Sequence, residues 1–197
     1  MKLDNNIQAP LFNRTDIFKR QTDLESYRGK KVLIAFFRHA GCPFCNLRVH
    51  SLTKIHQEMK EKGLEMIFFF ESPEKVLLRS TFHQEVSPIP LIADPEKKVY
   101  AEYGIESSGM ISAKSHLTTF VQTAYKAFKA KVPIHGMKEG ESINTIPAEF
   151  LVDENGMIKK LHYSKSLTDR MDLQVIKDFA NEEKATENKN KPIQVEL

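Results

Sequence analysis

The chain has 197 residues, of which 41% are hydrophobic and 28% are charged, and its net charge is +3. These values are ordinary for one globular domain with a sizeable core, and they favour neither a nucleic-acid-binding surface nor a membrane-binding patch. No apolar stretch typical of a secretory signal opens the chain, and its longest apolar runs are far shorter than the roughly 20 residues that span a bilayer. We therefore expect a cytoplasmic protein without membrane or nucleic-acid partners.

The N-terminal part predicts a short extension followed by a core strand. Two apolar pieces, Ala9–Phe12 and Ile17–Phe18, indicate the strands of a hairpin, and Leu24–Tyr27 indicates a single helical turn. Val32–Phe37 is a continuous apolar run, which is typical of a strand buried on both faces.

A helix is predicted over residues 46–62, ended by Gly63. Its apolar positions fall on one arc of a helix with 3.6 residues per turn: Val49, Leu52, Ile55 and Met59. Cys45 lies inside this arc, whereas Cys42 lies at its edge and one turn earlier. We therefore expect Cys45 to face the core and Cys42 to face the surface.

The next segments alternate between strand and helix. Leu64–Phe70 predicts a second buried strand, and Ser72-Pro73-Glu74 predicts a helix start with proline at the first helical position. A short strand ends at Asp94, and Val99–Tyr103 predicts a short helix. This β-α-β-α-β order favours a parallel sheet with covering helices.

Residues 105–145 are predicted to form a helical insertion. Its apolar stripe has helical spacing: Leu117, Phe120, Val121, Ala124, Tyr125 and Phe128. We expect this stripe to pack on the sheet and the lysines of the segment to face water. A basic amphipathic helix that binds a membrane or an acidic partner is the alternative.

The C-terminal part predicts a hairpin, a helix and a tail. Glu149–Val152 and Ile158–Tyr163 flank the turn at residues 153–156. The last helix is expected to start near Ser166, in a capping-box pattern. One domain is thus predicted over residues 1–182, followed by a disordered polar tail at residues 183–197.

Cys42-Pro43-Phe44-Cys45 lies between the first core strand and the following helix, and it contains the only cysteines of the chain. A C-x-x-C pair in this context is typical of a thioredoxin-like redox motif. The helix N-terminus stabilises a thiolate, and Arg38 at the strand end can add a positive partner. Pro43 stiffens the turn at an early helical position.

Other interpretations of the same residues remain open. The two cysteines can be unreactive buried thiols. His39 completes an H-x-x-C-x-x-C pattern, but a structural zinc site needs four ligands and no second pair follows. His39 can also polarise the sulfur or lie on the surface without a role, and Phe44 can serve as a substrate platform or as a lid. Arg48 is expected in a structural ion pair. No metal or organic cofactor is expected.

The chain resembles peroxiredoxin-like members of the AhpC/TSA group, in the thioredoxin superfamily, over roughly residues 9–180. The resemblance rests on these segments in order: Ala9–Phe12, Arg28–Val32, Phe36–Cys45, Ile92–Pro95, Tyr103–Gly104 and Ile146–Gly156. It implies an α/β, thioredoxin-like fold: a central mixed β-sheet flanked by helices, with an N-terminal extension and a helical insertion. It also implies a cis-proline at Pro147, after Thr145 and Ile146, facing the cysteine loop.

The resemblance leaves the attacking cysteine open. In the peroxiredoxin pattern P-x-x-x-T-x-x-C, Cys45 takes the peroxide-attacking position, Cys42 replaces the threonine and Arg38 replaces the proline. The family's arginine that holds the peroxide has no match near Ile146-Pro147. Thioredoxin logic instead makes Cys42 the attacking thiol and Cys45 the resolving one.

We predict an antioxidant oxidoreductase that reduces a peroxide or a protein disulfide through a Cys42–Cys45 dithiol/disulfide cycle. Catalysis is assigned to Cys42 and Cys45, and a supporting role to Arg38, His39, Pro43, Phe44, Thr145 and Pro147. A thiol reductant such as a thioredoxin or glutathione system regenerates the dithiol. The alternative is a non-enzymatic binding or redox-sensing module that uses the groove beside Pro147.

Overall fold

A computed structural model describes residues 1–105, 123–133 and 144–182. Its centre is a five-stranded sheet with the order β5 (Leu91–Ala93), β4 (Leu64–Phe70), β3 (Lys31–Phe37), β6 (Ala148–Val152) and β7 (Ile158–Tyr163). The first three strands are mutually parallel, whereas β6 and β7 run antiparallel to their neighbours. The predicted mixed sheet and α/β class are confirmed.

The two long apolar runs of the sequence form the middle of this sheet. All seven residues of β3 are buried, and so are six of the seven residues of β4. A continuous apolar run suits this position because a central strand is covered on both faces. The edge strand β7 carries mostly half-buried residues, as an edge beside solvent allows.

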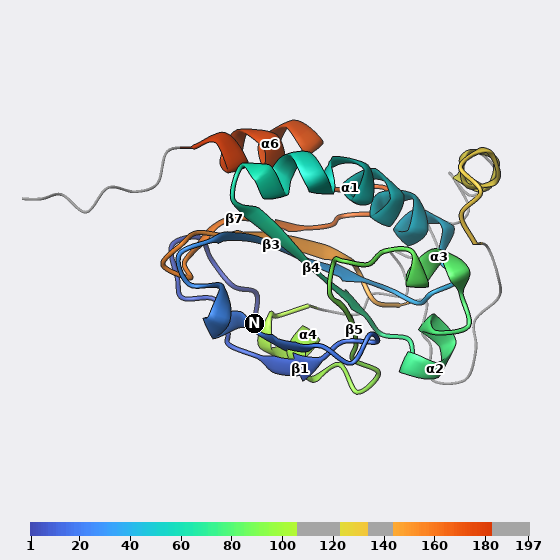
Figure 1. Cartoon of the computed structure of the whole chain (residues 1–197), viewed down its shortest axis with the longest axis horizontal. Helices are drawn as coiled ribbons and strands as arrows, with labels where there is room; N and C mark the ends of the chain where they lie inside the picture. The colour runs from blue at the N-terminus through green and yellow to red at the C-terminus, as the bar shows by residue number, and fades with distance from the viewer. Residues whose placement is uncertain (106–122, 134–143, 183–197) are drawn as a thin grey trace, which may run out of the picture.

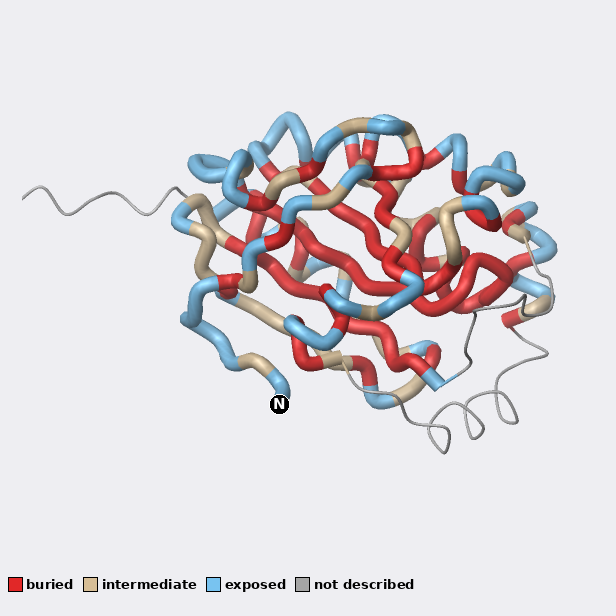
Figure 2. Tube along the Cα trace, turned by 90° about the horizontal axis from the view of Figure 1, so that it is seen from below, coloured by how far each residue is buried: buried red, intermediate tan, exposed pale blue. Residues whose placement is uncertain are grey.

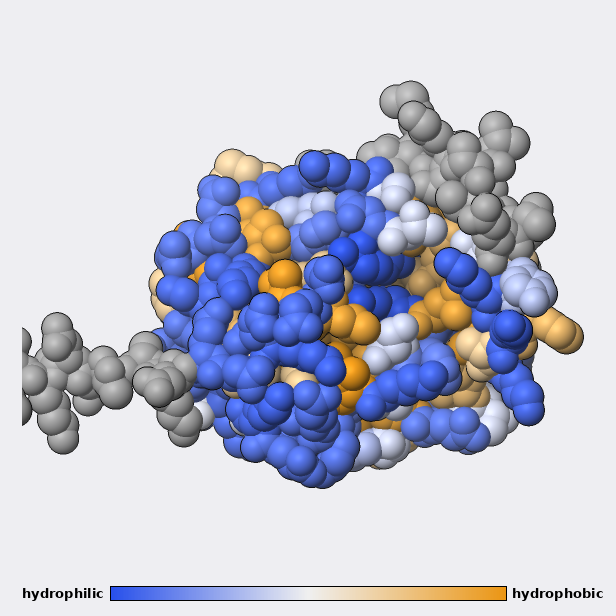
Figure 3. Space-filling view, turned by 90° about the horizontal axis from the view of Figure 1, so that it is seen from above, coloured by the Kyte–Doolittle hydropathy of each residue, from blue (hydrophilic) through white to orange (hydrophobic). Residues whose placement is uncertain are grey.

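Two layers cover the sheet (Figure 1). Helices α1 (Pro43–Glu61) and α6 (Leu173–Asn181) lie on one face. The hairpin of β1 (Asn13–Thr15) and β2 (Gln21–Asp23), the turn η1 (Leu24–Tyr27) and α4 (Lys98–Glu102) lie on the other. The outer surface of the α1 and α6 layer is largely hydrophilic (Figure 3), whereas the central strands of the sheet are buried (Figure 2).

The short helices α2 (Glu74–Leu77) and α3 (Thr81–Gln84) follow β4. Pro73 is the N-cap residue of α2 and not its first helical residue, so the helix begins one residue later than predicted. None of the helices in the described part of the chain combines the length and the apolar composition that a membrane span requires.

The N-terminal hairpin exists, but its predicted strands were wrong. The paired residues are Asn13–Thr15 and Gln21–Asp23, which are polar. The apolar Phe12 and Ile17 are buried beside the hairpin and anchor it to the cores of the two faces. Apolar side chains here mark the points of attachment, because a two-stranded hairpin has no core of its own.

The last helix begins later than predicted. Asp172 is its N-cap and accepts a hydrogen bond from the backbone N–H of Gln174 at 2.8 Å. Ser166 instead accepts from the N–H of Asp169 at 3.1 Å, which closes a local turn. Two competing capping sequences lie six residues apart, and the packing of Met171 and Phe179 into the core selects the second.

The packing predicted for the insertion was wrong in the part that the structure describes. Residues 123–129 are helical, but Tyr125 is 62% exposed and Phe128 is 78% exposed, while Thr123 and Ala127 are buried. The buried residues of this segment are therefore small ones and not the predicted aromatic ones. Leu117, Phe120 and Val121 lie outside the described residues, as does the predicted tail at 183–197.

Candidate active site

The cysteine pair lies where β3 ends and α1 begins. Cys42 is the N-cap residue of α1, with extended backbone angles, and Pro43 follows at the first helical position. Backbone N–H groups in the first turn of a helix have no partner within the helix. Proline, which lacks an N–H, therefore fits at this position without cost. The backbone N–H of Cys45 donates to Sγ of Cys42 at 3.4 Å. The Cys42 sulfur therefore takes the place of a capping oxygen and receives a donor of the first helical turn.

Arg38 completes the environment of Cys42. Its Nη2 atom donates to Sγ of Cys42 at 3.0 Å, and its backbone N–H lies 3.5 Å from Sγ of Cys45. Arg38 is fully buried, at 0% exposure. A guanidinium enclosed with a sulfur requires a negative partner, which favours the thiolate form of Cys42.

The two thiols have opposite acidities. Burial works against ionisation of Cys42, but the hydrogen bond from Cys45 and the positive charge of Arg38 outweigh it, so the pKa of Cys42 is well below its usual range. Burial raises the pKa of Cys45, and the hydrogen bond to the negative Cys42 raises it further. The reduced pair thus consists of a thiolate at Cys42 and a thiol at Cys45 that donates to it.

The expectation that Cys42 faces the surface was wrong. Cys42 and Cys45 are both 0% exposed. Helical spacing places Cys42 at the rim of the inward arc of α1, and in the folded protein this rim is buried as well. The loop before the helix is bound to the segment after β4, because Ala40 donates its N–H to Oγ of Ser72 at 2.7 Å. Access of any reagent to either sulfur therefore requires a local opening.

Asn46 also holds the loop, although no motif in the sequence singles it out. Its Nδ2 atom donates to the carbonyl of Ala40 at 2.7 Å and to that of Pro133 at 2.9 Å. This buried amide ties the start of α1 to the cysteine loop and to the end of the described insertion. A polar residue directly after the second cysteine, on the inward side of the helix, was the available signal.

His39 and Phe44 are both buried beside the pair. His39 is 5% exposed, which excludes the alternative of a surface position, and its carbonyl accepts from the N–H of Cys42 at 3.0 Å. Its positive form contributes to the low pKa of Cys42, after burial, Cys45 and Arg38. Phe44 is 4% exposed and lines a hollow on the outer side of α1. It remains a candidate platform or lid.

Pro147 lies at the same sheet end as the cysteines, because the next residue, Ala148, pairs with Phe36 of β3. The predicted cis peptide was wrong. The cis bond among the described residues is Ser87–Pro88, and the Ile146–Pro147 bond is trans. The carbonyl of Pro147 accepts from the N–H of Ser164 at 3.0 Å, which ties it to the end of β7.

Thr145 belongs to a buried polar group behind the site. Its Oγ1 donates to Glu71 at 2.5 Å and accepts from Nζ of Lys97 at 2.9 Å. Lys97 also forms an ion pair with the fully buried Glu71 at 2.9 Å. Since the N–H of Glu71 donates to the carbonyl of Arg38 at 3.3 Å, this group supports the strand end that carries the arginine.

Arg48 forms a structural ion pair, as predicted. Its Nε and Nη2 atoms bind the two carboxylate oxygens of Glu149 at 2.7 and 2.8 Å, and Nη2 also donates to the carbonyl of Met171. Both side chains are buried. This bidentate pair connects α1 with β6 one turn beyond Cys45.

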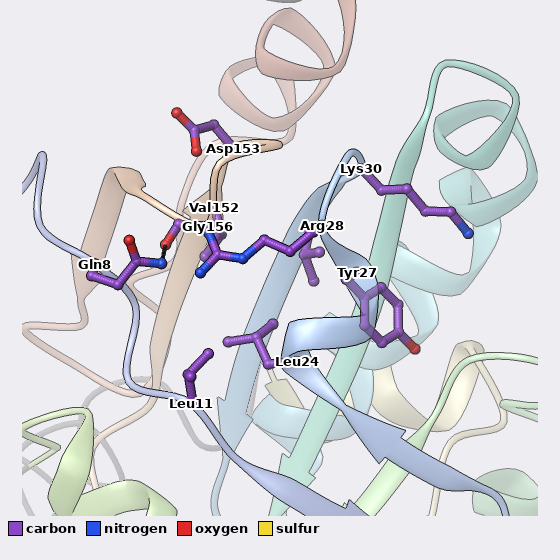
Figure 4. Close-up of a pocket in the computed structure, with 10 residues that line it drawn as sticks. Gln8, Leu11, Leu24, Tyr27, Arg28, Lys30, Val152, Asp153 and Gly156 are labelled. Atoms are coloured by element: carbon purple, nitrogen blue, oxygen red, sulfur yellow. Dashed lines mark hydrogen bonds between the residues drawn. The ribbon is translucent and has the colours of Figure 1, made fainter.

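No cluster of three potential metal ligands occurs within residues 1–105, 123–133 and 144–182. One further cavity, between Arg28, Gln8 and Gly156, is lined by residues from the opposite end of β3 (Figure 4). It measures about 10 Å³, and Gln8 donates to the carbonyl of Gly156 across it at 3.0 Å. It has room for one water molecule at most.

A C-x-x-C pair at a helix N-terminus, beside the central strand of a thioredoxin-like sheet, places the protein in the class of thioredoxin-like redox proteins. The family model of the AhpC/TSA family matches residues 6–161, and the chain belongs to that family.

Similar proteins fall into two groups. The thiol-disulfide oxidoreductase ResA of Bacillus thuringiensis (strain Al Hakam) is 24% identical over 104 residues, which is 53% of this chain and 60% of ResA. Peroxiredoxin Bcp of Escherichia coli (strain K12) is 25% identical over 109 residues, 55% of this chain and 69% of Bcp. The match to ResA thus spans less than two thirds of that relative's length.

Two solved structures share the fold. Peroxidoxin BcpB from Mycobacterium tuberculosis superposes with a TM-score of 0.59 at 14% identity, covering 90% of this chain and 93% of BcpB. The yeast mitochondrial 1-Cys peroxiredoxin gives a TM-score of 0.61 at 14% identity, covering 88% of this chain and 73% of that protein. At these identities the likeness shows the thioredoxin-like fold.

Proposed function

We propose that the protein is a thiol-based oxidoreductase that reduces a peroxide or a disulfide through a Cys42–Cys45 dithiol/disulfide cycle. The observation that carries this proposal is the contact of 3.0 Å between Nη2 of Arg38 and Sγ of Cys42. The thiolate is the nucleophilic form of cysteine, and here a buried cation and a helix N-terminus both favour it. A structural cysteine in a core has no need of either.

Cys42 is the attacking residue in both reactions. With a peroxide, its thiolate attacks one oxygen and the O–O bond breaks. Cys42 becomes a sulfenic acid, and the leaving oxygen takes up a proton as water or alcohol. With a disulfide, the thiolate forms a mixed disulfide and releases one substrate thiol. Arg38 is placed to stabilise the negative charge that moves away from the sulfur.

Cys45 completes either reaction. It gives up its proton and attacks Sγ of Cys42, which releases water from the sulfenic acid or the second thiol from the mixed disulfide. The product is the Cys42–Cys45 disulfide. An external thiol reductant of the thioredoxin or glutathione type then supplies two electrons and two protons to restore both thiols. The assignment of Cys45 as the first nucleophile is less favourable, because Cys45 holds its proton.

Burial of both sulfurs favours a small oxidant. A peroxide needs a smaller opening above Cys42 than a protein disulfide does, and each 0% exposed sulfur requires some opening. We place the reaction in the cytoplasm, since reducing compartments keep such thiols reduced at rest.

One measurement on one reduced sample tests the proposal: consumption of hydrogen peroxide compared with reduction of insulin disulfides. We expect turnover of at least one substrate, loss of it in Cys42→Ser, and an intramolecular disulfide in the wild-type product by intact mass. A protein that consumes neither substrate and has two slowly alkylated thiols is instead a non-enzymatic binding module. A covalent dimer as main product contradicts the intramolecular cycle.

A further inference from the structure

A hollow of about 270 Å³ lies beside the first turns of α1, and Phe44 of the cysteine motif lines it. Phe44 and Leu47 of α1 form part of its wall, Lys126 approaches from the insertion, and Thr168 and Arg170 approach from the segment before α6. Phe44 is the residue between Pro43 and Cys45, so the hollow adjoins the motif itself. Its volume far exceeds that of hydrogen peroxide and suits a small organic molecule.

One edge of the Arg170 guanidinium has no hydrogen-bond partner among the described residues. Its Nη1 atom donates to the carbonyl of Asp169 at 2.8 Å and lies 3.3 Å from Oγ of Ser164. Its Nε and Nη2 atoms are enclosed and have no hydrogen-bond partner among the residues that the structure describes. Enclosed donors without an acceptor are costly and rare in folded proteins, so this pair calls for an acceptor from outside the chain.

The geometry of that edge selects a carboxylate. Nε and Nη2 carry parallel N–H groups that match the two oxygens of a carboxylate. The same two atoms of Arg48, on the neighbouring helix, bind the two oxygens of Glu149 at 2.7 and 2.8 Å. Arg48 is thus satisfied within the chain, whereas the equivalent edge of Arg170 finds no acceptor in the part of the chain that the structure describes.

The charge around the hollow also favours an anion. Lys126 is exposed and forms no ion pair with the described residues, and no acidic side chain is found among the described residues that line the hollow. The hollow therefore carries the positive charges of Arg170 and Lys126, while Glu149 neutralises Arg48. Arg170 also acts on the redox pair: burial raises the pKa of Cys45, and the charge of Arg170 partly opposes that effect.

We propose that this hollow binds the carboxylate of a small organic thiol or hydroperoxide that reacts with the cysteine pair, through Nε and Nη2 of Arg170 and the charge of Lys126. This inference rests on the proposed oxidoreductase function and names the substrate class of that site. Because the two nitrogens are enclosed, binding requires a local shift of the side chains around Arg170.

Both kinds of reagent, the thiol and the hydroperoxide, give a balanced reaction. Two molecules of the organic thiol reduce the Cys42–Cys45 disulfide to the two protein thiols, and they leave as one organic disulfide. A hydroperoxide takes two electrons from the Cys42 thiolate when its O–O bond breaks, which leaves an alcohol or acid and the sulfenic acid of Cys42. The carboxylate takes no part in either reaction and serves only to hold the reagent.

Matched reagents distinguish the two sources. Oxidised full-length protein is reduced with 3-mercaptopropionate or with the neutral 2-mercaptoethanol, and rates are corrected for the thiolate fraction of each reagent. Reduced protein is oxidised with monoperoxysuccinate or with peracetate. We expect a preference of about ten-fold for the carboxylated reagent in at least one arm, the size of effect that a charge-assisted bidentate contact produces. The arm that shows it identifies the source.

Arg170→Met should abolish the preference, and Arg170→Lys should restore only part of it because lysine lacks the paired donors. If Arg170→Met fails to fold, Lys126→Met, at an exposed position, provides the test and should weaken the preference for the carboxylated reagent. The matched control is Arg14→Met on β1, which lies on the other face of the sheet. Equal rates for both reagents in both arms, or a preference that survives Arg170→Met, overturn this inference alone. Failure of all four reagents to react overturns the proposed function.

Discussion

The Nη2 atom of Arg38 lies 3.0 Å from Sγ of Cys42, and this contact places a cation and a thiolate together in the core. The two residues are four positions apart, at the end of β3 and at the N-cap of α1. Arg38 directly follows β3, and its carbonyl accepts from the N–H of Glu71 at 3.3 Å, while Sγ of Cys42 accepts from the N–H of Cys45 in the first turn of α1 at 3.4 Å. The contact is therefore set by two rigid elements and not by a surface loop.

Replacing Arg38 by methionine should raise the pKa of the reactive thiol. The guanidinium favours the negative form of Cys42, and a charge within about 4–6 Å shifts a pKa by about one to three units. The pH dependence of alkylation by a small neutral reagent measures this value. Arg14→Met provides the control and should leave the profile unchanged. An unchanged profile in folded Arg38→Met would mean that the helix N-terminus alone holds the thiolate.

Single cysteine variants should behave asymmetrically. Cys45→Ser retains the contact between Arg38 and Cys42, so a mixed disulfide with substrate should accumulate at Cys42 because no resolving thiol remains. Cys42→Ser leaves a buried Cys45 with a raised pKa, and we expect slow alkylation at neutral pH. Peptide mass mapping after trapping identifies the modified residue. Fast modification of Cys45 in the reduced wild type would reverse the assignment of roles.

The stability of the reduced protein should pass through a maximum near pH 8.5, the ordinary pKa of a cysteine. The folded pKa of Cys42 is lowered, so its contribution grows as pH rises from that pKa to about 8.5. The folded pKa of Cys45 is raised, so its contribution is complete below about 8.5 and is lost at higher pH. Urea unfolding of the reduced protein at pH values from 5 to 10 measures the free energy of unfolding over the range in which these two pKa shifts act. The double Cys→Ser variant is the control and should lack this maximum.

Breaking the ion pair between Arg48 and Glu149 should destabilise the fold strongly. Arg48→Met leaves a buried carboxylate beside Met171, and the loss of one partner of a buried pair costs about 3–5 kcal/mol. Urea unfolding of the reduced protein measures the difference. The double variant Arg48→Met/Glu149→Met should be less destabilised than Arg48→Met, since it leaves no unpaired charge. A loss below about 1 kcal/mol in the single variant would show that the carboxylate finds water or a proton instead.

The sequence by itself determined the central strands and the position of the motif. Val32–Phe37 and Leu64–Phe70 are local apolar runs, and a run of that length is buried wherever the chain folds. The capping position of Cys42 follows from Pro43 and from the helical spacing after it. These features depend on neighbours within a few residues, so a pattern along the chain is enough to find them.

Only the tertiary structure decided what surrounds the sulfurs. Cys42 is buried, and the loop before it and Asn46 are bound by Ser72 and Pro133, which lie 30 and 91 positions further along the chain. The exposure of Tyr125 and the trans bond before Pro147 likewise contradict what spacing or resemblance predicted. Helical periodicity states which side of an element a residue occupies. Whether another segment covers that side, and whether Arg38 turns toward the sulfur, depends on contacts between residues far apart in the chain, which no local pattern records.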